Sequence, residues 1–114
     1  MGNFNQVILM GNLTRDPELT YTPAQTAVVD FGLAVNRKWK KQDGSQAEEV
    51  LFIDCKMFGT RAEVVNKHFG KGDSILVVGH LKFEQWDGKD GAKHSKIRAM
   101  VESFEFVGTK RGND

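Results

Sequence analysis

Residues 50–69 read VLFIDCKMFGTRAEVVNKHF and join a strand pattern to a helix pattern through one glycine. The first half alternates apolar with more polar side chains, as a strand with one buried face does, and its predicted inward set is Leu51, Ile53, Cys55 and Met57. The second half holds the capping-box motif Thr60-Arg61-Ala62-Glu63, which predicts a helix N-terminus with Thr60 as its cap. The helix should bury one apolar stripe and end at Gly70 or Gly72; the stripe is Ala62, Val65 and Phe69.

Four more runs show the alternation and the β-branched and aromatic content of strands: residues 4–13, 26–39, 74–86 and 94–107. A short extended piece, ELTYT, lies between two Pro-containing turns. The turn signals Asp43-Gly44, Asp87-Gly88 and Asp90-Gly91 predict two hairpins that project as polar fingers. Three strands, one helix and two strands is the element order of the OB-fold. We therefore expect an all-β protein with one short helix, a five-stranded Greek-key barrel with the helix between strands 3 and 4.

The bulk composition indicates one globular domain and excludes several function classes. The 114 residues are 39% apolar and 27% charged, which suits a single small core. The chain contains no apolar run of membrane-spanning length and no signal-peptide pattern, and Gln6 replaces the Ser or Thr of a myristoylation motif. A cytoplasmic location is expected. Cys55 is the single cysteine, and we interpret it as a buried structural thiol. No metal-ligand spacing is present, so no metal and no cofactor are expected.

Large aromatic side chains occupy positions where the strand patterns call for polar ones. Phe52 and Phe58 share a parity with Asp54 and Lys56. In residues 74–86 the predicted inward set is Ile75, Val77, Leu81 and Phe83, which leaves Trp86 with the polar set His80, Lys82 and Glu84. The parity of Trp39 matches the core set of its strand. We expect a bulge or coil between residues 36 and 38 to expose it, because lysines flank it.

The aromatics Trp39, Phe52, Phe58 and Trp86 are interleaved with cations, although the net charge is only +1; the cations are Arg37, Lys38, Lys40, Lys41, Lys56 and Lys82. Unpaired bases stack on aromatic rings and phosphates need cations, so this combination favours single-stranded nucleic acid with little sequence preference. A single exposed Phe more often covers a neighbour, and the basic run alone is more often a solvated loop. An aromatic face is also typical of an oligomer interface.

Two other functions fit the fold less well. A nuclease needs clustered carboxylates or a general base near a nucleophile, and Asp54 and Glu84 have no evident third ligand. We therefore expect no enzymatic activity. A primosome-type or protein-interaction OB module, whose aromatic face meets a protein partner, is the remaining alternative. Quenching of the tryptophan fluorescence by oligo-dT distinguishes the two binding functions.

From about Asn5 to Gly108 the chain resembles the bacterial single-stranded-DNA-binding proteins, the SSB family. The resemblance rests on the ordered stretches VILMGNLTRDPELTYTP, FGLAVNRKW, VLFIDCKMFGTRAEVVNKHFGKGDSILVVGHLKFEQW and DGKDG. It implies that the four aromatics are base-stacking positions and that Arg61 and Lys71 lie near phosphate contacts. It also implies a homotetramer, with the N-terminal strand as a plausible interface, that works in DNA replication, recombination and repair at the nucleoid.

Two departures from the family pattern modify these expectations. Family members continue into a tail with an acidic tip that recruits replication and repair proteins, whereas residues 110–114 follow the predicted domain (1–109) directly. Either a tail has been trimmed or this member lacks that arm, and such partners are expected only if the full-length protein has it. Asp54 and Glu84 also place carboxylates on the binding face, which should lower the affinity or make it more sensitive to salt.

Overall fold

The computed structural model describes residues 2–107, so the predicted tail at 110–114 lies outside the described residues. Seven elements follow in chain order: β1 (Val7–Leu13), β2 (Glu18–Tyr21), β3 (Ala27–Lys40), β4 (Gln46–Phe58), α1 (Thr60–His68), β5 (Ser74–Asp87) and β6 (Lys93–Phe106). The strands pair in the order β1-β5-β6-β4-β3-β2. Within residues 2–107, no helix is both long enough and apolar enough to cross a membrane.

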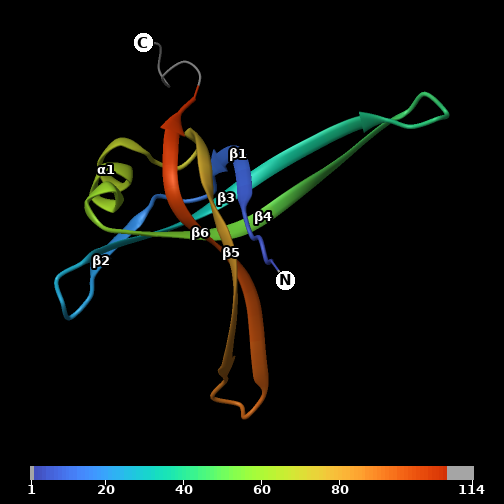
Figure 1. Ribbon diagram of the computed structural model, residues 1–114. Helices are drawn as coiled ribbons and strands as arrows, with labels where there is room; N and C mark the ends of the chain where they lie inside the picture. Colours follow the sequence, from blue (N-terminus) through green and yellow to red (C-terminus); the bar gives the residue numbers. More distant parts are fainter. Residues whose placement is uncertain (1, 108–114) are drawn as a thin grey trace.

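Five of the strands close into a barrel, and β2 adds to its side (Figure 1). The ring closes where the end of β1 pairs with β3 at Asn12–Ala34 and Leu13–Leu33. On the other side β4 and β6 run parallel and pair only at Cys55–Ala99 and Lys56–Met100. This confirms the OB-fold. The helix lies between the third and fourth barrel strands as expected, which are β4 and β5 once the short strand β2 is counted.

The core fills the barrel between the strands and α1. Phe31, Leu33, Cys55, Val65 and Ile75 have no exposed surface. Each comes from the alternating inward set of its strand or from the apolar stripe of the helix, because those periods place side chains on one face. Burial of Ala62, Val65 and Phe69 confirms the predicted stripe.

The capping-box prediction was wrong. Gly59 is the N-cap of α1, with a φ of 100°, and no side chain caps the helix. Glu63 instead accepts a hydrogen bond of 2.7 Å from the hydroxyl of Tyr21 on β2. This interaction raises the pKa of Tyr21, with the hydrogen bond to Glu63 as the main cause. Because β4 runs directly into α1, a residue with positive φ at position 59 makes the turn, and such a φ favours glycine.

Two long hairpins leave the barrel in different directions (Figure 1). We call the outer part of the β3–β4 hairpin, residues 36–50, finger A, and the outer part of the β5–β6 hairpin, residues 83–97, finger B. Strand pairing continues to Lys40–Gln46 in finger A and to Asp87–Lys93 in finger B. The fingers are therefore paired ribbons with short tips and not extended polar loops, and each tip turns at a predicted Asp-Gly.

Several predicted inward side chains are exposed because they lie on these fingers or at their roots. Leu51 is 47% exposed, Leu81 37% and Phe83 60%. Their parity is the one expected, since Leu81 pairs with the buried Ala99 and Phe83 pairs with Ile97. Alternation tells which side of a strand a residue occupies, but the strand extends past the end of the core. The prediction that these three residues are buried was therefore wrong.

Candidate nucleic-acid interface

Trp39 and Trp86 occupy equivalent places, each one residue pair before the last pair of its finger. Trp39 pairs with Ala47 and is 40% exposed, whereas Trp86 pairs with His94 and is 48% exposed. The expected bulge before Trp39 is absent, since β3 and β4 stay in register along the whole of finger A. Trp39 is exposed because the ribbon has left the barrel, so the prediction of its exposure was right and its reason was wrong.

Each tryptophan has a different neighbour against its ring. The Arg37 guanidinium lies over Trp39 at 5.1 Å from the ring centroid, and it also pairs with Glu49 at 3.3 Å. The His94 ring stacks on Trp86 at 5.7 Å and 21° between the planes. Since such contacts cover only part of each indole, both rings keep surface on which a base can stack.

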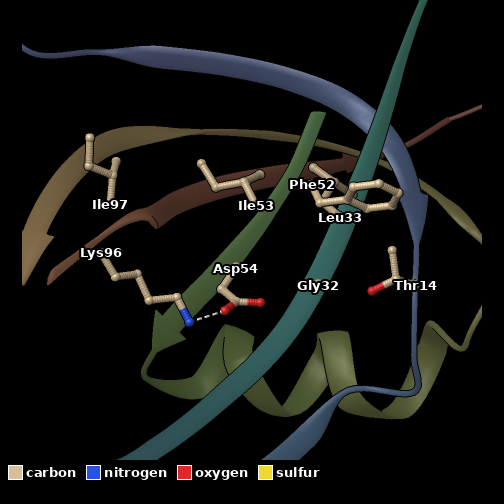
Figure 2. Close-up of a pocket in the computed structure, with 8 residues that line it drawn as sticks. All are labelled: Thr14, Gly32, Leu33, Phe52, Ile53, Asp54, Lys96 and Ile97. Atoms are coloured by element: carbon tan, nitrogen blue, oxygen red, sulfur yellow. Dashed lines mark ion pairs between the residues drawn. The ribbon is translucent and has the colours of Figure 1, made fainter. Parts of the chain in front are cut away.

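Phe52 lies at the rim of a groove between the two fingers. The groove has a volume of about 320 Å³ and opens where β4 and β6 separate beyond Cys55–Ala99. Figure 2 shows the eight residues around it: Thr14, Gly32, Leu33, Phe52, Ile53, Asp54, Lys96 and Ile97. Phe52 is 70% exposed and Ile97 54% exposed, so the lining offers apolar surface to solvent, and Asp54 and Lys96 add an ion pair to it. A groove of this kind suits a flat apolar group that carries a charge at its edge.

The carboxylates on this face are all paired with cations. Asp54 accepts from Arg15 at 3.4 Å and forms an ion pair with Lys96. Glu84 pairs with Arg98 at 3.1 Å. Hydrogen bonding to Lys96 is the main cause that lowers the pKa of Asp54, and desolvation opposes it. These contacts explain why carboxylates are tolerated on a strand face that also carries Phe52.

Lys56 and Lys82 lie on the same outward face. Lys56 is 3.9 Å from Asp30, which also pairs with Arg98 at 3.1 Å. Lys82 is exposed and is the register partner of Arg98. The structure thus brings Phe52, Lys56, Lys82 and Trp86 to one face of the β4–β6–β5 surface.

The lysines of finger A lie near Trp39. Lys38 and Lys40 are exposed on β3, and Lys41 follows at the tip. Within the described part of the chain, none of the three has a carboxylate at ion-pair distance. Trp39 lies on the opposite side of its ribbon from Phe52. Phe52 pairs with Ala34 on β3, and Trp39 is an odd number of residues from Ala34 along that strand, so the two side chains point to opposite faces.

Three predicted site residues lie away from the groove. Phe58 is 49% exposed at the end of β4, six residues from Phe52, or about 20 Å at the usual rise of a strand. Arg61 on α1 lies over the ring of Phe104 at 4.4 Å and donates to the Phe104 carbonyl oxygen. Lys71 lies in the turn after α1, where its backbone N–H donates to Asp16.

Strand β6 supplies site residues that the sequence reasoning missed. His94, Lys96 and Arg98 contact Trp86, Asp54 and Glu84, respectively. They alternate with Ile97 and Ala99, so the parity of KHSKIRAM could have placed them on the polar face. Their partners could not have been found in this way, because pairing across the barrel is a tertiary property. No group of three or more His, Cys, Asp or Glu side chains in residues 2–107 is placed to hold a metal ion.

Comparison with known proteins gives a consistent result. The family model described as "Single-strand binding protein family" matches residues 4–107. The chain is 50% identical over 111 residues to a single-stranded DNA-binding protein of Helicobacter hepaticus, which covers 97% of this chain and 65% of that protein. It is 47% identical over 107 residues to the protein of the same name from Wolinella succinogenes, covering 94% and 66%.

A third relative, the single-stranded DNA-binding protein of Helicobacter pylori, is 44% identical over 110 residues, covering 96% of this chain and 62% of that protein. The chain thus spans slightly less than two thirds of the length of these three relatives. The family model extends over every strand of the barrel, the helix and both fingers. This chain therefore belongs to the single-strand binding protein family.

Proposed function

We propose that this chain binds single-stranded DNA with little sequence preference and protects it during replication, recombination and repair. The observation that supports this most is the pair of exposed tryptophans near the tips of two ribbons, with the Phe52 groove between them. Stacking accepts any base, because every base has a flat apolar face. The role is binding without catalysis.

The lysines of finger A and Lys82 supply cations for the phosphates, so the affinity should fall as salt rises. By resemblance to the family, we assign Phe58, Arg61 and Lys71 to a longer path that the DNA strand follows around the barrel. Duplex DNA hides its base faces in the stack and should bind much more weakly. The cytoplasm, at the nucleoid, is where this function would be exercised.

A titration with oligo-dT tests the proposal directly. The tryptophan fluorescence should fall on addition of oligo-dT and recover when salt is added, and a duplex of equal length should compete poorly. An unchanged fluorescence at low salt, together with no shift in mass, would contradict the proposal. A signal that appears only with a protein partner would favour the protein-interaction module.

We further propose that the chain assembles as a homotetramer, in which the N-terminal strand forms one interface. Ile8 and Met10 on β1 are 62% and 54% exposed. They pair with Val78 and Leu76 on β5, so four apolar side chains adjoin on the outer surface. Contiguous apolar surface of this kind is typical of a protein interface. Mass determination of the free protein and of its DNA complex gives the subunit number.

A further inference from the structure

The outward face between the fingers carries seven charged side chains joined in two chains of ion pairs. The pairs are Arg15–Asp54–Lys96 and Lys56–Asp30–Arg98–Glu84. Four cations thus pair with three carboxylates on the surface that we propose binds single-stranded DNA. In the free protein these cations already have anionic partners, unlike Lys40 and Lys41 of finger A.

The two chains differ in how far they are open to solvent. The Arg98 side chain is 17% exposed and uses separate nitrogens for Asp30 and Glu84, each at 3.1 Å. Lys96 and Arg15 are 36% and 48% exposed at the side chain. A phosphate can reach Lys96 or Arg15 from solvent, whereas Arg98 is held between two carboxylates. Exchange of partners is therefore open to the Asp54 group.

Asp54 lies at the centre of that group and two residues from Phe52, the proposed stacking platform. Its Oδ1 faces Arg15 and its Oδ2 faces Lys96, which extends to it along the groove (Figure 2). Gly32 opposite Asp54 allows this approach, because a Cβ there would lie 2.6 Å from the Arg15 Nη1. The two cations converge on one carboxylate in the groove that Phe52 borders.

We propose that Asp54 is a built-in competitor for DNA phosphate, which occupies Lys96 and Arg15 and thereby limits the affinity for single strands. This inference rests on the proposed function, because a base stacked on Phe52 brings its phosphate to the rim of the same groove. The phosphate must share Lys96 with a carboxylate that keeps its charge. Removal of that charge makes Lys96 and Arg15 available to the DNA backbone.

The test is Asp54→Asn, with binding to labelled oligo-dT followed by fluorescence anisotropy over a range of salt. The variant should bind about fivefold more tightly at low salt, the size expected for a partly exposed ion pair. Its salt dependence should steepen by about 0.7 in log–log slope for each additional phosphate that a freed cation binds. Glu63→Gln is the matched control, since it removes the same charge on α1 and keeps an oxygen for Tyr21.

The variants Lys96→Gln and Asp54→Asn/Lys96→Gln complete a double-mutant cycle, and a thermal melt shows that each is folded. The gain of Asp54→Asn should fall when Lys96 is also removed and disappear when Arg15→Gln is added. A gain that survives without both Lys96 and Arg15, or that Glu63→Gln reproduces, would overturn the inference. So would weaker binding by Asp54→Asn, which would mean that the carboxylate positions Lys96 for DNA. The wild type tests the proposed function separately, because a wild type that binds no oligo-dT refutes the function itself.

Discussion

Fingers A and B have the same construction and different chemistry. Each tip has five residues, KQDGS at 41–45 and GKDGA at 88–92. In each, an Asp carboxylate accepts from the N–H two residues on, and the glycine after that Asp has a positive φ, 89° and 82°. The tryptophans occupy the same place relative to the tip, so the turn chemistry does not distinguish the fingers.

The side chains around each tryptophan distinguish the two fingers. Finger A, residues 36–50, carries four cations and three acids, and the cation over Trp39 is always charged. Finger B, residues 83–97, carries three of each and places His94 on Trp86. One shared ribbon shape thus carries a net cationic surface around Trp39 and, around Trp86, a more aromatic surface with equal numbers of cations and acids. Under the proposed function, this difference would divide phosphate attraction and base stacking unequally between the two fingers.

The largest expected effect comes from removal of the tryptophans. Each stacked base is worth roughly 1–3 kcal/mol, so Trp39→Ala/Trp86→Ala should weaken binding of oligo-dT by at least about 30-fold. Of the single variants, Trp39→Ala should lose more, because His94 stays in finger B as a second ring. Anisotropy of a labelled oligonucleotide measures this without tryptophan fluorescence. Tyr21→Ala removes an aromatic of similar exposure outside the fingers and should bind nearly as the wild type. An equal or greater loss for Trp86→Ala would reverse the ranking of the fingers.

A smaller effect is expected from the lysines of the tips. Lys40→Gln/Lys41→Gln should weaken binding and flatten the log–log salt slope by about 0.7 for each phosphate that the variant no longer neutralises. The matched change in finger B, Lys89→Gln/Lys93→Gln, should alter the slope less, because finger B carries as many acids as cations whereas finger A has one more cation than acids. Titrations at several salt concentrations give both slopes. Equal slopes in the two double variants would mean that the fingers share the phosphates evenly.

The smallest effect concerns the root at which the fingers separate. Cys55 pairs there with Ala99 and has no exposed surface. Burial is the main cause that raises its pKa to about 12, so the folded protein should keep a protonated, unreactive thiol at pH 8. Ellman's reagent should react slowly with the native protein, with or without oligo-dT, and rapidly in guanidinium chloride.

The sign of this pKa shift gives the pH dependence of stability. Because the thiol pKa is higher in the folded protein, the thiol ionises first in the unfolded chain as pH rises. That ionisation stabilises the unfolded state and lowers the free energy of unfolding. Stability should therefore decline as pH rises above the ordinary thiol pKa of about 8.5. In the Ellman's-reagent experiment, fast labelling of Cys55 in the DNA complex but not in the free protein would show that the β4–β6 root opens when the fingers bind DNA.

The sequence by itself determined which side of each strand faces the core, where the fingers turn and where the helix lies. These properties are local, since strand alternation, Asp-Gly turns and an apolar helical stripe each depend on neighbours along the chain. The exposed aromatics Phe52 and Trp86 followed from that alternation. So did the buried Cys55, because parity is independent of what lies across the barrel.

Tertiary structure alone decided how far the core extends along each strand and which charges pair. β4 and β6 pair over only two positions, so Leu51 and Phe83 lie beyond the core although their parity is inward. The same separation opens the groove at Phe52. Closure of the barrel also brings Lys96 within reach of Asp54, which lies 42 residues earlier in the chain. Side chains so far apart in sequence meet only once the strands have paired.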